Sequence, residues 1–170
     1  MTPEQYSQQL LQLIDDNKAI LFRICNAYCR NKNDREDLAQ EMIYQLWKSG
    51  QTFNPAQKFT TWMYRVALNV AISFYRKEKN SSLVPLNEEL TELPAHHESN
   101  EMEEKIYLLQ QFINQLKELD RALMILYLEA RSYQEIAEIL GITETNVATK
   151  ISRIKEKLKT QFSKQFSNII

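Results

Sequence analysis

Glycine and proline, the residues that most often interrupt regular helices, are scarce in this chain. Its 170 residues include 2 glycines and 4 prolines. Glycine supplies most of the positive-φ positions that tight β-turns need, and proline interrupts helices because it lacks a backbone donor. A chain with so few of both can form long helices but few hairpins. The sequence therefore predicts an all-α fold.

One of the two glycines, Gly141, lies inside a strongly helical stretch that spans residues 132–159. Ser132 and Glu135 have the S-x-x-E spacing of a capping box, so a helix should begin directly after Ser132. Gly141 can end that helix because glycine adopts the left-handed conformation without steric cost. Thr143 can then cap a second helix that runs to about residue 159. This pattern predicts either a helix-turn-helix or an ordinary helical hairpin of a bundle.

The outward face of the second helix favours the helix-turn-helix. Its apolar residues recur at helical spacing, which leaves short and mostly polar side chains on the opposite face. Such side chains can lie against base edges in a major groove, and a basic flank beyond them can bind phosphates. The residues predicted to contact duplex DNA are Thr143, Thr145, Asn146, Ala148, Thr149, Lys150, Ser152, Arg153 and Lys155.

Charge divides the chain into three segments. Residues 1–79 carry 11 basic and 8 acidic side chains, and residues 105–170 carry 10 and 7, so each has a net charge of +3. Residues 80–104 carry 7 glutamates and no Lys or Arg, a net charge of −7. Like charges with few large apolar residues are typical of a linker. The sequence therefore predicts two small helical domains, 1–79 and 105–170, joined by a flexible acidic linker.

Four helices are predicted before the linker, at Pro3–Asp16, Lys18–Arg30, Arg35–Lys48 and Thr60–Lys79, with Asp34 capping the third. The fourth helix has one apolar face for the core. A second face carries Trp62, Arg65, Asn69, Ser73 and Arg76 at helical spacing. Aromatic rings stack on unpaired bases and arginines hold phosphates, so this face suits single-stranded nucleic acid. Taken alone, it also fits a solvated amphipathic face with one half-buried tryptophan.

Two segments resemble a known family. "DREDLAQEMIYQLWKSGQTFNPAQKFTTWMYRVALNVAISFYRKEK" is similar to region two of the extracytoplasmic-function sigma factors of bacterial RNA polymerase, and "LKELDRALMILYLEARSYQEIAEILGITETNVATKISRIKEKL" to their region four. The motifs D-L-x-Q-E, W-x-Y-R-x-A-x-N and Y-x-E-I-A-x-x-L-G-I occur in the family's order. The resemblance implies an alternative sigma factor that binds core RNA polymerase and directs promoter-specific transcription initiation.

The resemblance also implies a role for particular residues. Those expected to dock on the large polymerase subunit are Asp37, Leu38, Gln40, Glu41 and Trp47. Those expected to capture and read the melted minus-ten element are Phe53, Asn54, Lys58, Phe59, Trp62, Arg65, Asn69 and Arg76. The duplex-binding residues of the helix-turn-helix would read the minus-thirty-five element. The family often has V-K-S-R or V-K-T-R where this chain has Val147-Ala148-Thr149-Lys150, which leaves open which bases are read.

Two other kinds of function are compatible with parts of the sequence. One is a stand-alone helix-turn-helix regulator, and the other is an adaptor that uses its helices for protein contacts. The sequence shows no phosphate loop, metalloprotease pair or paired nucleophile and base, so no catalytic residue, cofactor or metal site is predicted. Cys25 and Cys29 are expected to be reduced core thiols, and His96 and His97 to be loop residues.

The expected partners follow from the resemblance: core RNA polymerase, promoter DNA and an anti-sigma factor, with no small-molecule substrate. The longest apolar runs fall short of a membrane span. The first residues, "MTPEQYSQQLLQLIDD", lack the basic start and apolar centre of a signal peptide, so the chain is expected to be cytoplasmic.

Overall fold

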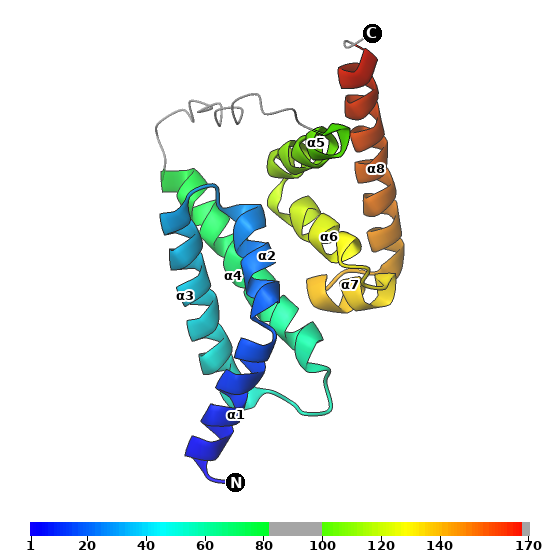
Figure 1. Ribbon diagram of the computed structural model, residues 1–170. Helices are drawn as coiled ribbons and strands as arrows, with labels where there is room; N and C mark the ends of the chain where they lie inside the picture. The colour runs from blue at the N-terminus through cyan, green and yellow to red at the C-terminus, as the bar shows by residue number, and fades with distance from the viewer. Residues whose placement is uncertain (82–99, 168–170) are drawn as a thin grey trace.

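The computed structural model describes residues 1–81 and 100–167, and every regular element in these two ranges is helical (Figure 1). The N-terminal half, residues 1–81, contains α1 (Pro3–Asp16), α2 (Lys18–Tyr28), α3 (Lys32–Ser49), the 3-10 helix η1 (Gly50–Thr52) and α4 (Phe59–Ser81). The C-terminal half, residues 100–167, contains α5 (Glu101–Gln115), α6 (Glu118–Leu128), α7 (Tyr133–Leu140) and α8 (Glu144–Ser167). The all-α prediction is confirmed. None of the described helices is both long and apolar enough to cross a membrane.

The predicted start of α3 is wrong. The helix begins at Lys32 rather than at Arg35. The cap is Asn31, whose side-chain oxygen accepts a hydrogen bond from the backbone N–H of Asp34 at 2.7 Å. Asparagine is as good an N-cap as aspartate, and its use here leaves Asp34 in the first turn, where the helix dipole favours a negative charge.

Other helix ends also differ from the predicted ones. α2 ends earlier than expected, and α8 continues past residue 159 to Ser167. α5 begins at Glu101, so the last residues of the predicted linker belong to a helix. Residues 82–99, which make up most of the predicted linker, lie outside the described residues.

The helix-turn-helix has the predicted caps. Ser132 accepts a hydrogen bond from the backbone N–H of Glu135 at 3.1 Å. Gly141 ends α7 with a φ of 68°, in the left-handed region that glycine adopts freely. The Thr143 hydroxyl accepts from the backbone N–H of Asn146 at 3.1 Å and caps α8. The scarce glycine therefore makes the turn between the two helices.

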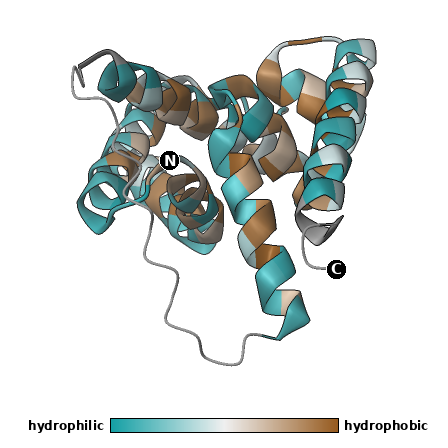
Figure 2. Cartoon of the chain, turned by 90° about the horizontal axis from the view of Figure 1, so that it is seen from above, coloured by the Kyte–Doolittle hydropathy of each residue, from teal (hydrophilic) through white to brown (hydrophobic). Residues whose placement is uncertain are grey.

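The core of the N-terminal half is continuous with that of the C-terminal half. α4 packs against α2 and α3, and α8 packs against α6 and α7. The halves meet where α4 contacts α6 and α7, and where α2 contacts α5 and α6. Apolar residues lie mainly on the sides of the helices that face other helices (Figure 2). α4 is therefore both the central helix of its own half and the helix that borders the other half.

The two cysteines lie in this core. Cys25 and Cys29 are free and buried, as predicted for core thiols. Burial raises the pKa of Cys25 to about 11 and the pKa of Cys29 to about 12. Both side chains are therefore protonated, unreactive thiols at neutral pH. His96 and His97 lie outside the described residues.

Candidate nucleic-acid interface

α3 turns a mixed polar and apolar side to solvent. Of the residues predicted to dock on polymerase, Asp37, Gln40 and Glu41 are exposed, and Trp47 is 41% exposed. Leu38 is fully buried, so its predicted place on a docking surface is wrong. Leu38 lies four residues before Met42 and eight before Leu46, which are also buried, and it packs inward with them.

Two exposed apolar residues on this side of α3 were missed from the sequence. Tyr44 is 51% exposed and Ile43 is 41% exposed. The buried residues Leu38, Met42 and Leu46 recur at a spacing of four and define the inner side of the helix. Helical geometry places Ile43 and Tyr44 outside that inner stripe, so this spacing could have found them.

The loop between α3 and α4 folds back onto the start of α4. The ring of Trp62 lies 4.9 Å from that of Phe53 and 5.5 Å from that of Phe59, measured between centroids. Trp62 is only 7% exposed, so the expectation that it offers an open stacking surface is wrong. The packing of these three rings holds the loop against α4. Asn54 and Lys58 of the same loop are exposed.

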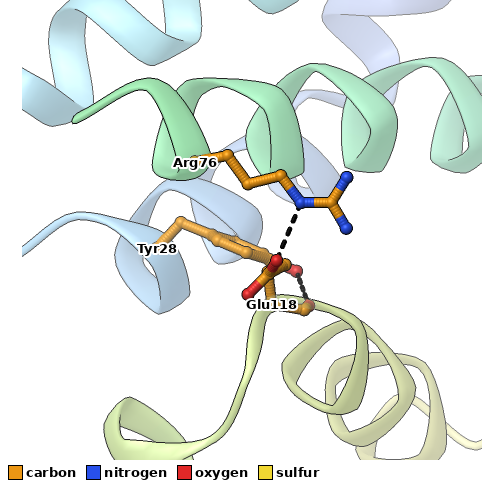
Figure 3. A network of polar contacts seen from close by, with 3 residues as sticks. All are labelled: Tyr28, Arg76 and Glu118. Atoms are coloured by element: carbon orange, nitrogen blue, oxygen red, sulfur yellow. Dashed lines mark hydrogen bonds and ion pairs between the residues drawn. The ribbon is translucent and has the colours of Figure 1, made fainter. Parts of the chain in front are cut away.

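The two arginines of the predicted minus-ten face are engaged by the C-terminal half. Arg65 donates a hydrogen bond from Nη2 to the backbone carbonyl of Glu138 at 2.7 Å. Arg76 donates from Nε to Oε1 of Glu118 at 2.7 Å, as Figure 3 shows. The hydrogen bond from Arg76 is the main reason that the pKa of Glu118 lies below its usual value. Both arginines therefore already have an acceptor in this structure.

Asn69 of α4 borders the side of that helix that faces α3. It is exposed and lines a surface hollow of about 770 Å³ together with Asp37, Glu41 and Glu78. Burial raises the pKa of Glu78, and the carboxylates of Asp34 and Asp37 raise it further. Lys77 also lines the hollow, so its lining carries three carboxyl groups and one ammonium group. The amide of Asn69 can both donate and accept hydrogen bonds, as the edge of an uncharged base requires.

The outer side of α8 is open along most of its predicted DNA-binding residues. Val147, Ile151 and Ile154 are buried against the other helices of the C-terminal half. The exposed residues are Thr143, Thr145, Asn146, Thr149, Ser152, Arg153 and Lys155, whereas Ala148 and Lys150 are half-buried. Lys155 does not point straight outward, because its Nζ lies 4.3 Å from the ring centroid of Tyr127. A hydrogen bond with Tyr127 is the main cause of a raised pKa of Lys155.

A buried arginine at the junction of the two halves was also missed. Arg121 is 3% exposed and donates hydrogen bonds to the backbone carbonyls of Ala27 at 3.1 Å and Asn114 at 2.7 Å. Its guanidinium carbon lies 5.3 Å and 4.8 Å from the ring centroids of Tyr28 and Tyr75. The one signal in the sequence is a charged residue at the start of the apolar run "RALMILYL". That run predicts burial but does not reveal the partners in the other half.

Comparison with known families places both halves of the chain. Sigma-70 region 2 matches residues 13–81, and Sigma-70 region 4 matches residues 106–158. Together the two matches cover more than half of the 170 residues and occur in the order expected from the sequence. The chain belongs to the extracytoplasmic-function sigma factors. It is an alternative sigma factor that directs transcription initiation rather than a stand-alone regulator.

Relatives along nearly the whole length support this assignment. The chain is 28% identical over 161 residues to the ECF RNA polymerase sigma factor SigW of Bacillus subtilis, with 88% of this chain and 86% of SigW covered. It is 26% identical over 157 residues to the RNA polymerase sigma factor SigV of the same organism, with 92% of each covered.

Two solved structures have a similar fold. One is CnrH in complex with the cytosolic domain of CnrY, with a TM-score of 0.67, 18% sequence identity and 94% of each chain covered. The other is the sigma factor RpoE in complex with the anti-sigma factor NepR from Bartonella quintana, with a TM-score of 0.65 and 21% identity. That match covers 94% of this chain and 98% of RpoE.

Proposed function

We propose that this sigma factor docks on core RNA polymerase through the exposed side of α3, reads the melted minus-ten element with α4 and its preceding loop, and reads the minus-thirty-five element as duplex DNA with α7 and α8. The observation that carries this proposal is the order of two sigma regions along the chain, the second with a capped helix-turn-helix whose outer side is open. The factor acts as a specificity subunit in the cytoplasm and performs no catalysis of its own.

The docking role of α3 is supported by the character of its exposed side. Large apolar side chains that are 41–51% exposed sit beside the carboxylate of Glu41 and the amide of Gln40. Exposed apolar residues rimmed by polar ones mark protein interaction sites. Ile43 and Tyr44 therefore join Asp37, Gln40, Glu41 and Trp47 in the proposed docking surface, whereas Leu38 supports it from beneath.

The minus-ten role of α4 is supported by two different chemistries on one helix. Asn69 opens into the hollow beside α3, where an amide can pair with the edge of an unstacked base. Arg65 and Arg76 lie one and two turns away from Asn69 along the same face and can hold phosphates once they are released from their present acceptors. Phe53, Phe59 and Trp62 shape the loop that presents Asn54 and Lys58.

An anti-sigma factor is a further partner in this proposal. Both similar structures are complexes, and one of them is described as a complex with an anti-sigma factor. A protein that occupies the exposed side of α3 would prevent docking on polymerase.

The decisive experiment is transcription in vitro. Core polymerase is supplied with a pool of genomic promoters, with and without the purified chain, and new transcripts are sequenced. The double change Gln40→Ala, Glu41→Lys should abolish co-purification with core polymerase and all factor-dependent transcripts, because it removes an amide and reverses a charge in the docking surface.

The matched control is Glu4→Lys, Gln8→Ala on the exposed side of α1, which makes the same chemical changes away from α3. Helical circular dichroism should be unchanged in both double variants. Binding to core polymerase that survives the α3 changes would refute the docking role, and a lack of factor-dependent transcripts from the unmodified chain would refute the function as a whole.

A further inference from the structure

One backbone carbonyl connects α1 to the loop that precedes α4. The oxygen of Gly50, directly after α3, accepts a hydrogen bond from the hydroxyl of Tyr6 at 2.6 Å. The same oxygen accepts from the backbone N–H of Phe53 at 3.2 Å. A carbonyl oxygen has two lone pairs, so it can serve both donors. The side chain of Tyr6 and the first aromatic residue of the loop therefore meet at a single group.

Gly50, the other of the chain's two glycines, lies where α1 passes very close to the start of this loop. Leu10 of α1 is 3% exposed, and a Cβ atom added to Gly50 would clash with a Cδ atom of Leu10. The φ of Gly50 is −61°, which any residue adopts in a helix, so the backbone conformation does not require glycine here. The close approach of α1 is what requires it.

Phe53 carries this attachment into the loop. Its ring centroid lies 4.9 Å from that of Trp62 and 5.8 Å from that of Phe59. Asn54 follows at once and begins a turn, in which its Oδ1 accepts from the backbone N–H of Ala56 at 3.0 Å. The direction in which the turn presents its exposed residues thus depends on where Gly50 and Phe53 are held.

α1 has no other assigned part in recognition of DNA. The match to Sigma-70 region 2 begins at residue 13, so Tyr6 and Leu10 both precede it. Neither residue is among those predicted from the sequence to contact polymerase or promoter. Their contacts with Gly50 nevertheless reach the loop that is proposed to read the minus-ten element.

We propose that Tyr6 is a positioning residue for recognition of the minus-ten element. Through the carbonyl of Gly50, its hydroxyl fixes the loop of residues 53–59 in the orientation that reads the melted strand. This inference rests on the proposed function of that loop. A loop that is ordered before it binds loses less conformational entropy on binding, and fixed hydrogen-bonding groups reject a wrong base more strongly than mobile ones.

The test uses holoenzymes assembled from core polymerase and the full chain. Tyr6→Phe removes only the hydroxyl, and Gly50→Ala sets a methyl group against Leu10. Ser7→Ala is the matched control, because it removes a hydroxyl from the neighbouring residue whose hydrogen bond, to the carbonyl of Pro3 at 3.0 Å, stays within α1.

The measurement is base discrimination within one promoter pool. A promoter that the unmodified chain transcribes is randomised in its minus-ten and minus-thirty-five elements, and each copy carries a barcode in its transcribed region. We expect Tyr6→Phe and Gly50→Ala to lower discrimination at the minus-ten bases about threefold, as the loss of one neutral hydrogen bond would. Discrimination at the minus-thirty-five bases should not change, because the other half of the chain is proposed to read them. Ser7→Ala should change neither.

Hydrogen exchange of the free chains measures the loop without DNA. A peptide that covers residues 50–58 should exchange faster in Tyr6→Phe than in Ser7→Ala, whereas peptides from α8 should exchange equally in both. Equal exchange of the loop in these two variants would mean that the hydroxyl of Tyr6 does not hold it, and would overturn the inference.

The promoter pool gives two further results that would overturn it. Equal minus-ten discrimination in Tyr6→Phe and Ser7→Ala would mean that the position of the loop does not depend on Tyr6. A parallel loss at both promoter elements would mean that the hydroxyl only supports the fold as a whole. Failure of the proposed function is distinguishable, because the unmodified chain itself would then show no base preference in the minus-ten element.

Discussion

The two helices proposed to bind DNA, α4 and α8, have similar lengths and opposite surroundings. α8 buries one stripe against its own half and leaves its other side open. α4 buries its inner side in its own half and is also contacted by α6 and α7 of the other half. A helical face that the sequence predicts to point away from the core can therefore be exposed to solvent or packed against another part of the chain. The spacing of apolar residues along the helix does not distinguish the two cases.

The largest expected difference is in stability, between an arginine buried at the junction beside α4 and an arginine on the open side of α8. Arg121→Met should lower the free energy of unfolding by roughly 3 kcal/mol, because it leaves the carbonyls of Ala27, Asn114 and Leu116 without their donor and removes a buried cation from between two rings. Urea denaturation followed by circular dichroism measures the change.

Arg153→Met on the open side of α8 is the matched control. It makes the same substitution at an exposed residue, so it should change the free energy of unfolding by no more than about 0.5 kcal/mol. Equal losses in the two variants would show that the buried junction contributes no special stability, and the contrast between the two helices would lose its energetic basis.

The next largest expected difference between α4 and α8 is in how each contributes to DNA binding. Lys150→Ala and Arg153→Ala should each reduce the salt dependence of duplex binding, lowering the slope of log affinity against log salt by about one unit if each neutralises one phosphate. Asn69→Ala removes no charge and should leave that slope unchanged. It should instead impair transcription from a duplex promoter more than from a template that is already mismatched across the bubble.

Transcription from paired and pre-melted templates at several salt concentrations measures both effects. If Asn69→Ala were equally defective on the pre-melted template, its role would be a base contact that persists in the open complex rather than a role confined to melting. If the slope of log affinity against log salt were unchanged in the α8 variants, the basic residues of α8 would not bind phosphates and would only form a solvated helix face.

Much of the fold follows from the sequence, because the signals for it are local. Ser132 and Thr143 each accept from a backbone N–H three residues along the chain, and Gly141 bonds a carbonyl four residues back. The structure has all three caps as predicted. The start of α3 was missed because Asn31 and Asp34 are both good caps and only the folded chain decides between them.

The site was less predictable where its partners are distant in sequence. Arg65 finds its acceptor 73 residues away, and Arg121 finds one 94 residues away. Trp62 has the spacing of an outward residue, but the loop from Phe53 to Phe59 covers it. The spacing of residues along a helix predicts the side of the helix on which each residue lies. Burial also depends on whether another segment of the chain covers that side.

The loss of the Glu118 contribution in acid should be the smallest of these effects. The hydrogen bond from Arg76 lowers the pKa of Glu118 from its usual value of 4.5, so the carboxylate stabilises the folded chain at pH values above about 4.5 and loses this contribution as the pH falls below it. Arg76 is 62% exposed, so solvent screening limits the contribution to about 0.5 kcal/mol. The difference in unfolding free energy between the unmodified chain and Glu118→Gln should therefore be present at pH 6 and shrink as the pH falls below 4.5. The raised pKa of Glu78 has the opposite sign but is common to both proteins, so it cancels in the difference. Urea denaturation at a series of pH values measures this difference, and a difference that stays constant through the acid range would mean that the pair between Arg76 and Glu118 does not hold the two halves together in solution.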